Sequence, residues 1–144
     1  MNPFTLLFSF HGRINRAKYW LAVFIYVIYL GVLVSIAYWY ELEGGAFLVL
    51  ALLAIPIWVS GLAVGIKRLH DRDKSGWWIL LFYFGPQVLN GLASAAGENE
   101  QILSLLLSTA GFALTIWAFV ELGCLRGTPG PNRYGPDPLA TPTA

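Results

Sequence analysis

The sequence predicts an all-α, polytopic membrane protein, a four-transmembrane-helix bundle with both termini in the cytoplasm. Hydrophobic residues make up 57% of the chain and charged residues 12%, against about 25% charged in an average soluble domain. Four uncharged apolar stretches are each long enough to cross a bilayer as a helix. All nine Lys and Arg lie on one side of these stretches. These three observations together predict the fold class.

The four predicted spans cover residues 19–40, 46–66, 77–97 and 101–120. Helices are predicted because an open sheet would leave unpaired backbone groups in lipid, and no stretch alternates as a barrel strand does. The remaining chain is too short for a separate soluble domain. We therefore expect one integral-membrane domain over residues 1–138, followed by a disordered tail over residues 139–144.

Before the first span, the apolar run from residue 4 to residue 10 is too short to cross the membrane. We expect it to lie at the interface. Within the later spans, Pro56 and Pro86 are each expected to kink their helix, because proline removes a backbone hydrogen bond. Gln87 and Asn90 follow Pro86 at helical spacing, and we favour hydrogen bonds between helices over a substrate pathway for them.

The connections between spans differ sharply in charge. Residues 41–45 and 98–100 contain acids and no cations, whereas residues 67–74 and the two tails contain all nine Lys and Arg. Loops rich in Lys and Arg stay in the cytoplasm. The termini and the middle loop are therefore predicted to be cytoplasmic, and the distinctive residues of the chain share that side.

Three cytoplasmic segments carry recognisable patterns: GRINRAKYW at residues 12–20, RLHDRDKSGWW at 68–78, and GTPGPNRYGPDP at 127–138. In order and spacing they resemble the small bacterial inner-membrane proteins of domain-of-unknown-function family 805. The resemblance extends over about residues 8 to 138. It implies a multi-pass location in the bacterial cytoplasmic (inner) membrane, and it brings no established activity.

We place a candidate functional face on these segments. Its residues are Arg13, Arg16, Arg68, His70, Asp71, Ser75, Trp77, Asn132, Arg133, Tyr134 and Asp137. Arg68, Asp71 and Arg72 could pair at helical spacing if the second span continues past the membrane. The free cations either mark topology alone or bind anionic headgroups, at about 1 kcal/mol per cation.

The tail and Glu121 are expected to close this face. The Gly- and Pro-rich tail cannot continue as helix, so we expect a strap that folds back on the middle loop, with Arg133 near Asp71 or Asp73. Glu121 follows an uncharged span directly. Because an acid near the membrane needs a partner, we favour a structural ion pair with Arg68 or Arg126 over a proton relay.

The chemistry-bearing residues support no catalytic or metal site. His70, Asp71 and Asp73 could bind a metal only with further ligands, and no nucleophile motif or phosphate loop is present. We therefore expect no metal, no cofactor and no enzyme activity. An enzyme acting on lipid headgroups would rest on these three residues alone.

The leading functional hypothesis is a non-enzymatic scaffold or accessory protein whose cytoplasmic face binds a protein partner or anionic lipid. The alternative is a small oligomeric transporter or channel that uses Gln87, Asn90 and Glu121 along a path. We expect no nucleic-acid partner. The small residues repeated at i, i+4 in the spans leave a homo-oligomer open.

Overall fold

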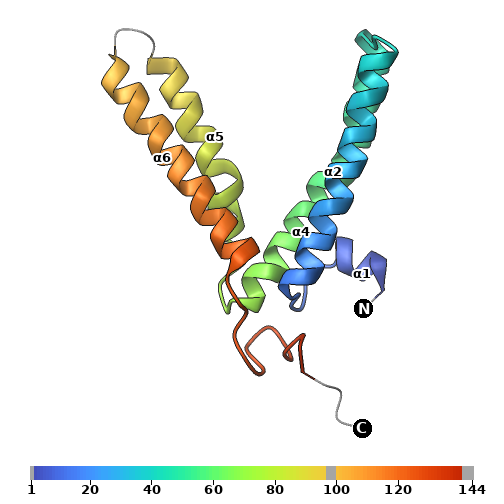
Figure 1. Ribbon diagram of the computed structural model, residues 1–144, viewed down its shortest axis with the longest axis vertical. Coiled ribbons are helices and arrows are strands. Elements are labelled where there is room, and N and C mark those ends of the chain that lie inside the picture. The colour runs from blue at the N-terminus through green and yellow to red at the C-terminus, as the bar shows by residue number, and fades with distance from the viewer. Residues whose placement is uncertain (1, 97–99, 141–144) are drawn as a thin grey trace.

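The computed structural model describes residues 2–96 and 100–140, which form helices followed by an irregular C-terminal segment (Figure 1). In chain order these are α1 (Pro3–Phe8), α2 (Arg16–Trp39), α3 (Gly44–Leu53), α4 (Ile55–Asp71), α5 (Trp78–Ala96), α6 (Gln101–Phe119) and the π-helix η2 (Val120–Cys124). Four helical segments are long and apolar enough to cross a membrane: 16–39, 44–71, 78–96 and 101–124. The predicted all-α fold with four spans is confirmed.

The second crossing consists of two helices, α3 and α4, that meet at Ala54. Pro56 lies in the first turn of α4, where its missing N–H costs nothing because the first turn of a helix has no intrahelical acceptor. The break predicted at Pro56 is thus confirmed. Pro86 differs, because α5 continues through it from Trp78 to Ala96.

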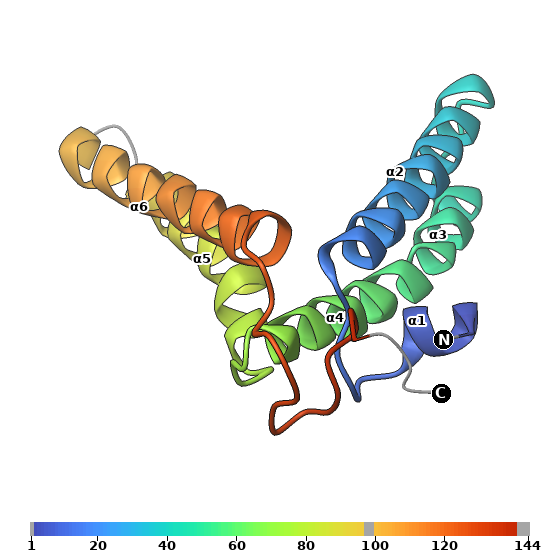
Figure 2. The same ribbon diagram turned by 60° about the horizontal axis from the view of Figure 1, so that its bottom comes forward.

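The helices form two hairpins that diverge from one end of the molecule (Figures 1 and 2). One hairpin pairs α2 with α3 and α4, and the other pairs α5 with α6. Glycine allows the second pair to approach closely, because Leu114 Cδ2 lies 2.5 Å from where a Cβ on Gly85 would stand. The α1 helix and the C-terminal segment lie at the end where the hairpins meet.

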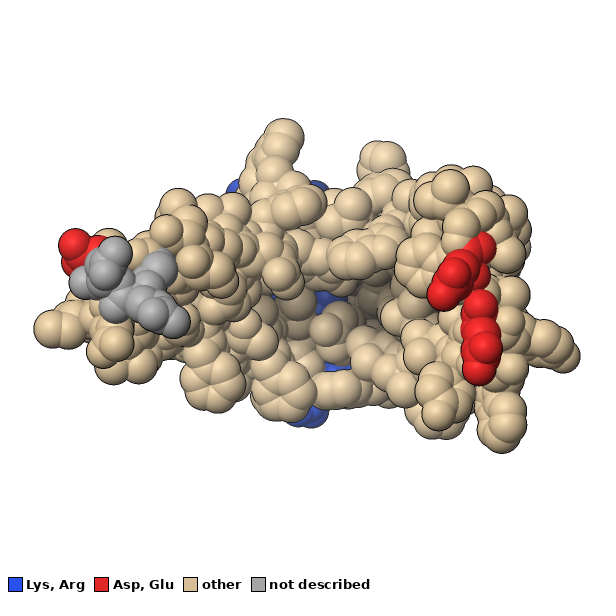
Figure 3. All heavy atoms as spheres, turned by 90° about the horizontal axis from the view of Figure 1, so that it is seen from above, with Lys and Arg blue, Asp and Glu red and all other residues tan. Residues whose placement is uncertain are grey.

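Along both hairpins, large apolar side chains are exposed, as expected for helices that face lipid. Trp39 is 80% exposed and Ile102 is 78% exposed. Viewed along the hairpins, Asp and Glu lie at both tips, and Lys and Arg are visible at the floor of the hollow between them (Figure 3). This separation of charge is the one on which the cytoplasmic orientation of the termini was predicted.

The buried core lies where the hairpins meet. One apolar cluster contains Leu6, Ile14, Ala22 and Val64, and a second contains Leu69, Ile79, Phe82 and Leu122. The first apolar run forms a helix of six residues, too short to cross a membrane, and its position at the interface stays a prediction. Its helix α1 packs on α4. Residue 97 of the predicted third span and residues 141–144 of the predicted tail lie outside the described residues. Leu139, which was also predicted to belong to the tail, donates its N–H to Asp137 in a turn.

Candidate functional site

The three segments of the candidate face meet below the hairpins and form what we call the cap: residues 9–16, 67–76 and 120–140. Each segment is positioned by a helix, because the first leads into α2, the second ends α4, and the third follows α6. The most deeply buried polar side chains of the described molecule lie in or beside it, namely Arg13, Ser60, Lys67, Arg68, Asp71 and Glu121.

At the centre of the cap, Asp71 accepts from two arginines. Oδ1 of Asp71 lies 3.1 Å from an Nη of Arg13, and Oδ2 accepts from Arg68. The side chains of both arginines are at most 1% exposed. Arg13 also donates to the carbonyls of Thr128, Gly130 and Gly135. One guanidinium therefore joins all three segments of the cap.

One carboxylate cannot neutralise two guanidinium groups, and the end of α6 supplies the remaining negative potential. Arg68 donates to the carbonyl oxygens of Leu122, at 2.7 Å, and of Leu125. Helix C-termini carry unpaired carbonyls and a partial negative charge. The wider π turn, in which Leu125 N–H bonds to Val120, directs these carbonyls at the arginine.

Close backbone approach completes the cluster. A Cβ on Gly127 would lie 2.0 Å from Oδ2 of Asp71, so only glycine fits there with Asp71 in place. The next residue, Thr128, donates both its N–H and its hydroxyl to the backbone carbonyl of Asp71, at 2.8 and 3.1 Å. The start of the C-terminal segment is thus fixed to the end of α4.

Glu121 forms the ion pair that was predicted, with different partners. Its carboxylate lies 3.0 Å from Nε of Arg72 and 3.1 Å from Nζ of Lys74, and its side chain is 4% exposed. The predicted partners were Arg68 and Arg126. Arg68 is occupied by Asp71, and the backbone carbonyl of Arg126 instead accepts from Arg72. Lys74 also lies over the rings of Trp78 and Trp117.

The tail folds back onto the middle loop, as predicted. Asn132 donates to the carbonyl of His70 at 2.9 Å, and Arg133 pairs with Asp73 at 3.1 Å. Asp137 accepts from the backbone N–H groups of Leu139 and Gly130, each at 2.9 Å. These two hydrogen bonds to the charged form hold the pKa of Asp137 below its ordinary value.

His70, Ser75, Trp77 and Tyr134 take no part in the Asp71 cluster. The rings of His70 and Tyr134 stack with centroids 3.8 Å apart, and Nδ1 of His70 lies 3.2 Å from the carbonyl oxygen of Gly12. All four residues line a groove of about 410 Å³ between α4 and α5. Its other lining residues are Phe10, Leu62, Ile66, Gly76, Ile79 and Leu80. We call it the aromatic groove.

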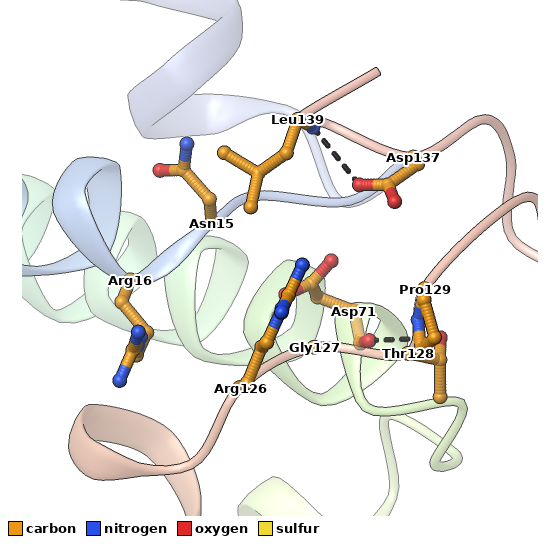
Figure 4. A pocket seen from close by; sticks show the side chains of 9 residues that line it. All are labelled: Asn15, Arg16, Asp71, Arg126, Gly127, Thr128, Pro129, Asp137 and Leu139. Carbon is orange, nitrogen blue, oxygen red and sulfur yellow. Dashed lines mark hydrogen bonds between the residues drawn. The ribbon is translucent and has the colours of Figure 1, made fainter.

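Arg16 and Arg126 lie on another side of the cap and form what we call the cationic patch. Arg16 donates to the carbonyl of Cys124, and no carboxylate of the described residues lies within salt-bridge distance of either arginine. Both line a pocket of about 30 Å³ (Figure 4), which is room for about one water molecule. Beside it, a more open groove of about 440 Å³ is lined by Arg16 and Trp20.

Gln87 and Asn90 lie on α5, away from the cap, and both are exposed. The amide of Asn90 lies over Gly111 of α6, about 3.3 Å from where a Cβ would stand. No hydrogen bond joins either side chain to another helix among the described residues. The hydrogen bonds predicted between helices are therefore absent from this part of the chain.

The buried polar side chains of the cap are all hydrogen-bonded. Within residues 2–96 and 100–140, every buried side-chain nitrogen and oxygen has a hydrogen-bond partner. The same residues contain no group of three His, Cys, Asp or Glu placed to hold a metal ion.

Sequence reasoning missed two parts of the cap. Lys67, which is fully buried, donates to the carbonyls of Thr5 and Leu6 at the end of α1. From the sequence it resembled the other cations of the middle loop, which indicate topology. It differs from a loop residue because α4 continues through it to Asp71. Gly127 and Thr128 looked like ordinary residues of the Gly- and Pro-rich strap. Their contacts depend on the path of a distant helix.

The comparisons with known proteins agree with this architecture. The chain is 31% identical over 137 residues to the inner membrane protein YhaH of Escherichia coli (strain K12), spanning 93% of this chain and 90% of that protein. It is 33% identical to the inner membrane protein YhaI over 90% of this chain and 86% of the relative. It is also 33% identical to the uncharacterized protein YiiR, over 91% and 86%. Both of the latter are from the same strain.

No solved structure matches the chain. The named relatives and the four spanning helices confirm the predicted multi-pass location in the inner membrane. The model of the family described as protein of unknown function DUF805 matches residues 7–136. With most of its length matched, the chain belongs to this family.

Proposed function

We propose that this protein is a non-enzymatic scaffold or accessory protein whose rigid cap binds anionic lipid headgroups at the cytoplasmic surface. The observation that carries the proposal is the division of the cations. Arg13 and Arg68 are buried and paired with Asp71, whereas Arg16 and Arg126 lie on the surface with no acid paired to them among the described residues. The surface pair is left for an external anion.

Electrostatics supports an anionic ligand. The cap end carries all nine Lys and Arg against four acids, Asp71, Asp73, Glu121 and Asp137, which is a net charge of +5. The cytoplasmic leaflet has a negative surface potential that attracts such residues. Trp20 lies beside Arg16 and donates its indole N–H to the carbonyl of Gly123. An indole held there suits the headgroup region.

Transport is not favoured by the geometry. The hypothesis needed Gln87, Asn90 and Glu121 along one path. Glu121 is buried in the cap between Arg72 and Lys74, and a carboxylate held by two cations is poorly suited to exchange protons with a pathway.

The test is lipid selectivity of the full chain in nanodiscs that contain anionic phosphatidylglycerol and neutral phosphatidylcholine. The double variant Arg16→Gln with Arg126→Gln should lose its preference for phosphatidylglycerol by about 30-fold, since two cations contribute about 2 kcal/mol. The matched control is Arg133→Gln, an exposed arginine already paired with Asp73. Equal loss in both variants would reject the cationic patch as the site.

A further inference from the structure

Two groups of four residues stand out in the candidate face: one joins the segments of the cap, and the other lines the aromatic groove. Arg13, Arg68, Asp71 and Asn132 join the segments of the cap. His70, Ser75, Trp77 and Tyr134 instead line the aromatic groove. Trp77 is 79% exposed at its edge. His70 and Tyr134 also join segments of the cap, but those contacts use Nδ1 and a ring face of His70 and leave Nε2 without a partner among the described residues.

The aromatic groove changes character along its length. Toward the hairpins it is lined by Leu62 and Ile66 of α4 and by Leu80 of α5. Toward the cap it is lined by His70, Ser75 and Tyr134. Leu62 and His70 are eight residues apart on one helix, which is about 12 Å along its axis. The groove therefore runs from membrane depth to the interface, apolar at one end and polar at the other.

The polar end offers one acceptor and one donor. The carbonyl of Gly12 can only accept, so Nδ1 of His70 is the donor in their hydrogen bond, and Nε2 of the neutral ring is an acceptor. No described residue bonds to Nε2, which lies about 3.4 Å from where a Cβ on Gly76 would stand. The hydroxyl of Ser75 accepts from Trp77 N–H, which leaves its own hydrogen to donate.

We propose that the aromatic groove binds a single phospholipid, with an acyl chain between α4 and α5 and a headgroup that donates a hydrogen bond to Nε2 of His70. Ser75 donates to a phosphate oxygen. The chemistry selects headgroups that carry a donor, such as phosphatidylethanolamine or phosphatidylglycerol, over phosphatidylcholine, whose quaternary ammonium has none. This site is separate from the cationic patch and does not depend on it, because it selects a hydrogen-bond donor and not a net charge.

Native mass spectrometry of the full chain, titrated with each of the three lipids, tests the proposal. Wild type should bind phosphatidylethanolamine about fivefold more tightly than phosphatidylcholine, which also has no net charge, the effect of about one hydrogen bond. His70→Phe keeps a ring to stack on Tyr134 but removes both nitrogens, and it should abolish this difference. If wild type binds phosphatidylethanolamine and phosphatidylcholine equally, the donor-selective headgroup site is wrong.

A second pair of variants tests occupancy of the groove without touching the cap. Leu80→Trp fills the apolar end and should remove the tight binding of phosphatidylethanolamine. Leu81→Trp is the control, because Leu81 is 40% exposed against 41% for Leu80 and does not line the groove. Equal binding by these two variants overturns the proposal even if His70→Phe fails to fold.

The same titration separates this site from the cationic patch. The double variant Arg16→Gln with Arg126→Gln should bind phosphatidylethanolamine as wild type does. If it loses phosphatidylethanolamine while Leu80→Trp retains it, the bound lipid lies at the patch and the groove is empty.

Discussion

The cap and the hairpins are stabilised by opposite means. Along the hairpins, apolar side chains such as Trp39 and Ile102 are exposed, and the helix pairs meet at small residues such as Gly85 and Gly111. In the cap, Lys67 and Arg68 are fully buried and charged groups meet one another. Lipid solvates apolar surface, so burying it contributes little in a membrane. The relative position of the hairpins therefore depends on polar contacts in the cap as well as on the apolar cluster of Leu69, Ile79, Phe82 and Leu122.

The largest effect is expected from Asp71→Asn, which acts on the cap and not on the hairpins. Removing the charge leaves Arg13 and Arg68 buried without a carboxylate, and we expect the free energy of unfolding to fall by about 3–5 kcal/mol. Asp73→Asn is the control, since its pair with Arg133 is exposed and contributes about 0–1 kcal/mol. Reversible unfolding in mixed micelles measures both. Similar losses in the two variants would show that burial of the cluster does not matter.

Gly127→Ala tests the same cluster through packing. The added Cβ would meet the Asp71 carboxylate, so Asp71 or the chain must shift, at about 1–3 kcal/mol. Gly31→Ala on α2 is the control, because nothing lies within 4 Å of its added Cβ and alanine favours the helix by about 1 kcal/mol. The melting temperature should fall for the first variant and hold or rise for the second. The opposite order would contradict the proposed fit at Gly127.

The smallest expected effect is a pH dependence confined to the tail. The pKa of Asp137 is lowered by the N–H groups of Leu139 and Gly130. Its contribution is therefore fully present above the ordinary pKa of an aspartate and is lost as pH falls through the lowered value. The protection of the N–H groups of Gly130 and Leu139 against hydrogen exchange, relative to the intrinsic rate at each pH, should fall in that range. Asp137→Asn should lower the protection of these two N–H groups at neutral pH, while protection in the hairpins stays unchanged.

The sequence could predict the helices and which of their ends lie together, because both follow from local composition. Span length and hydropathy fix where helices occur, the charged loops indicate which ends lie together, and Pro56 marks the break in the second crossing. The same reasoning predicted the tail strap and placed Arg133 near Asp71 or Asp73, and the structure pairs it with Asp73. These features depend on residues close in sequence or on a single strong charge pattern.

Partner choice inside the cap could not be predicted, because it depends on how the hairpins cross. Glu121 needed a cation, and several lay at suitable depth. The choice of Arg72 and Lys74 is fixed by the π turn of η2, which has no recognisable sequence pattern. The stacking of His70 on Tyr134 joins residues 64 positions apart and depends on the same path of the tail.

The dependence of Arg68 on the end of the chain has a consequence for biogenesis. Apart from Asp71, its acceptors are the carbonyls of Leu122 and Leu125, and Arg13 needs those of Thr128, Gly130 and Gly135. Both arginines are synthesised and delivered to the membrane before any of these acceptors exists. Until translation nears completion, Arg13 and Arg68 of the first hairpin therefore stay in contact with water or lipid headgroups. A chain truncated before residue 122 retains those exposed cations, which would distinguish it from finished protein for membrane proteases.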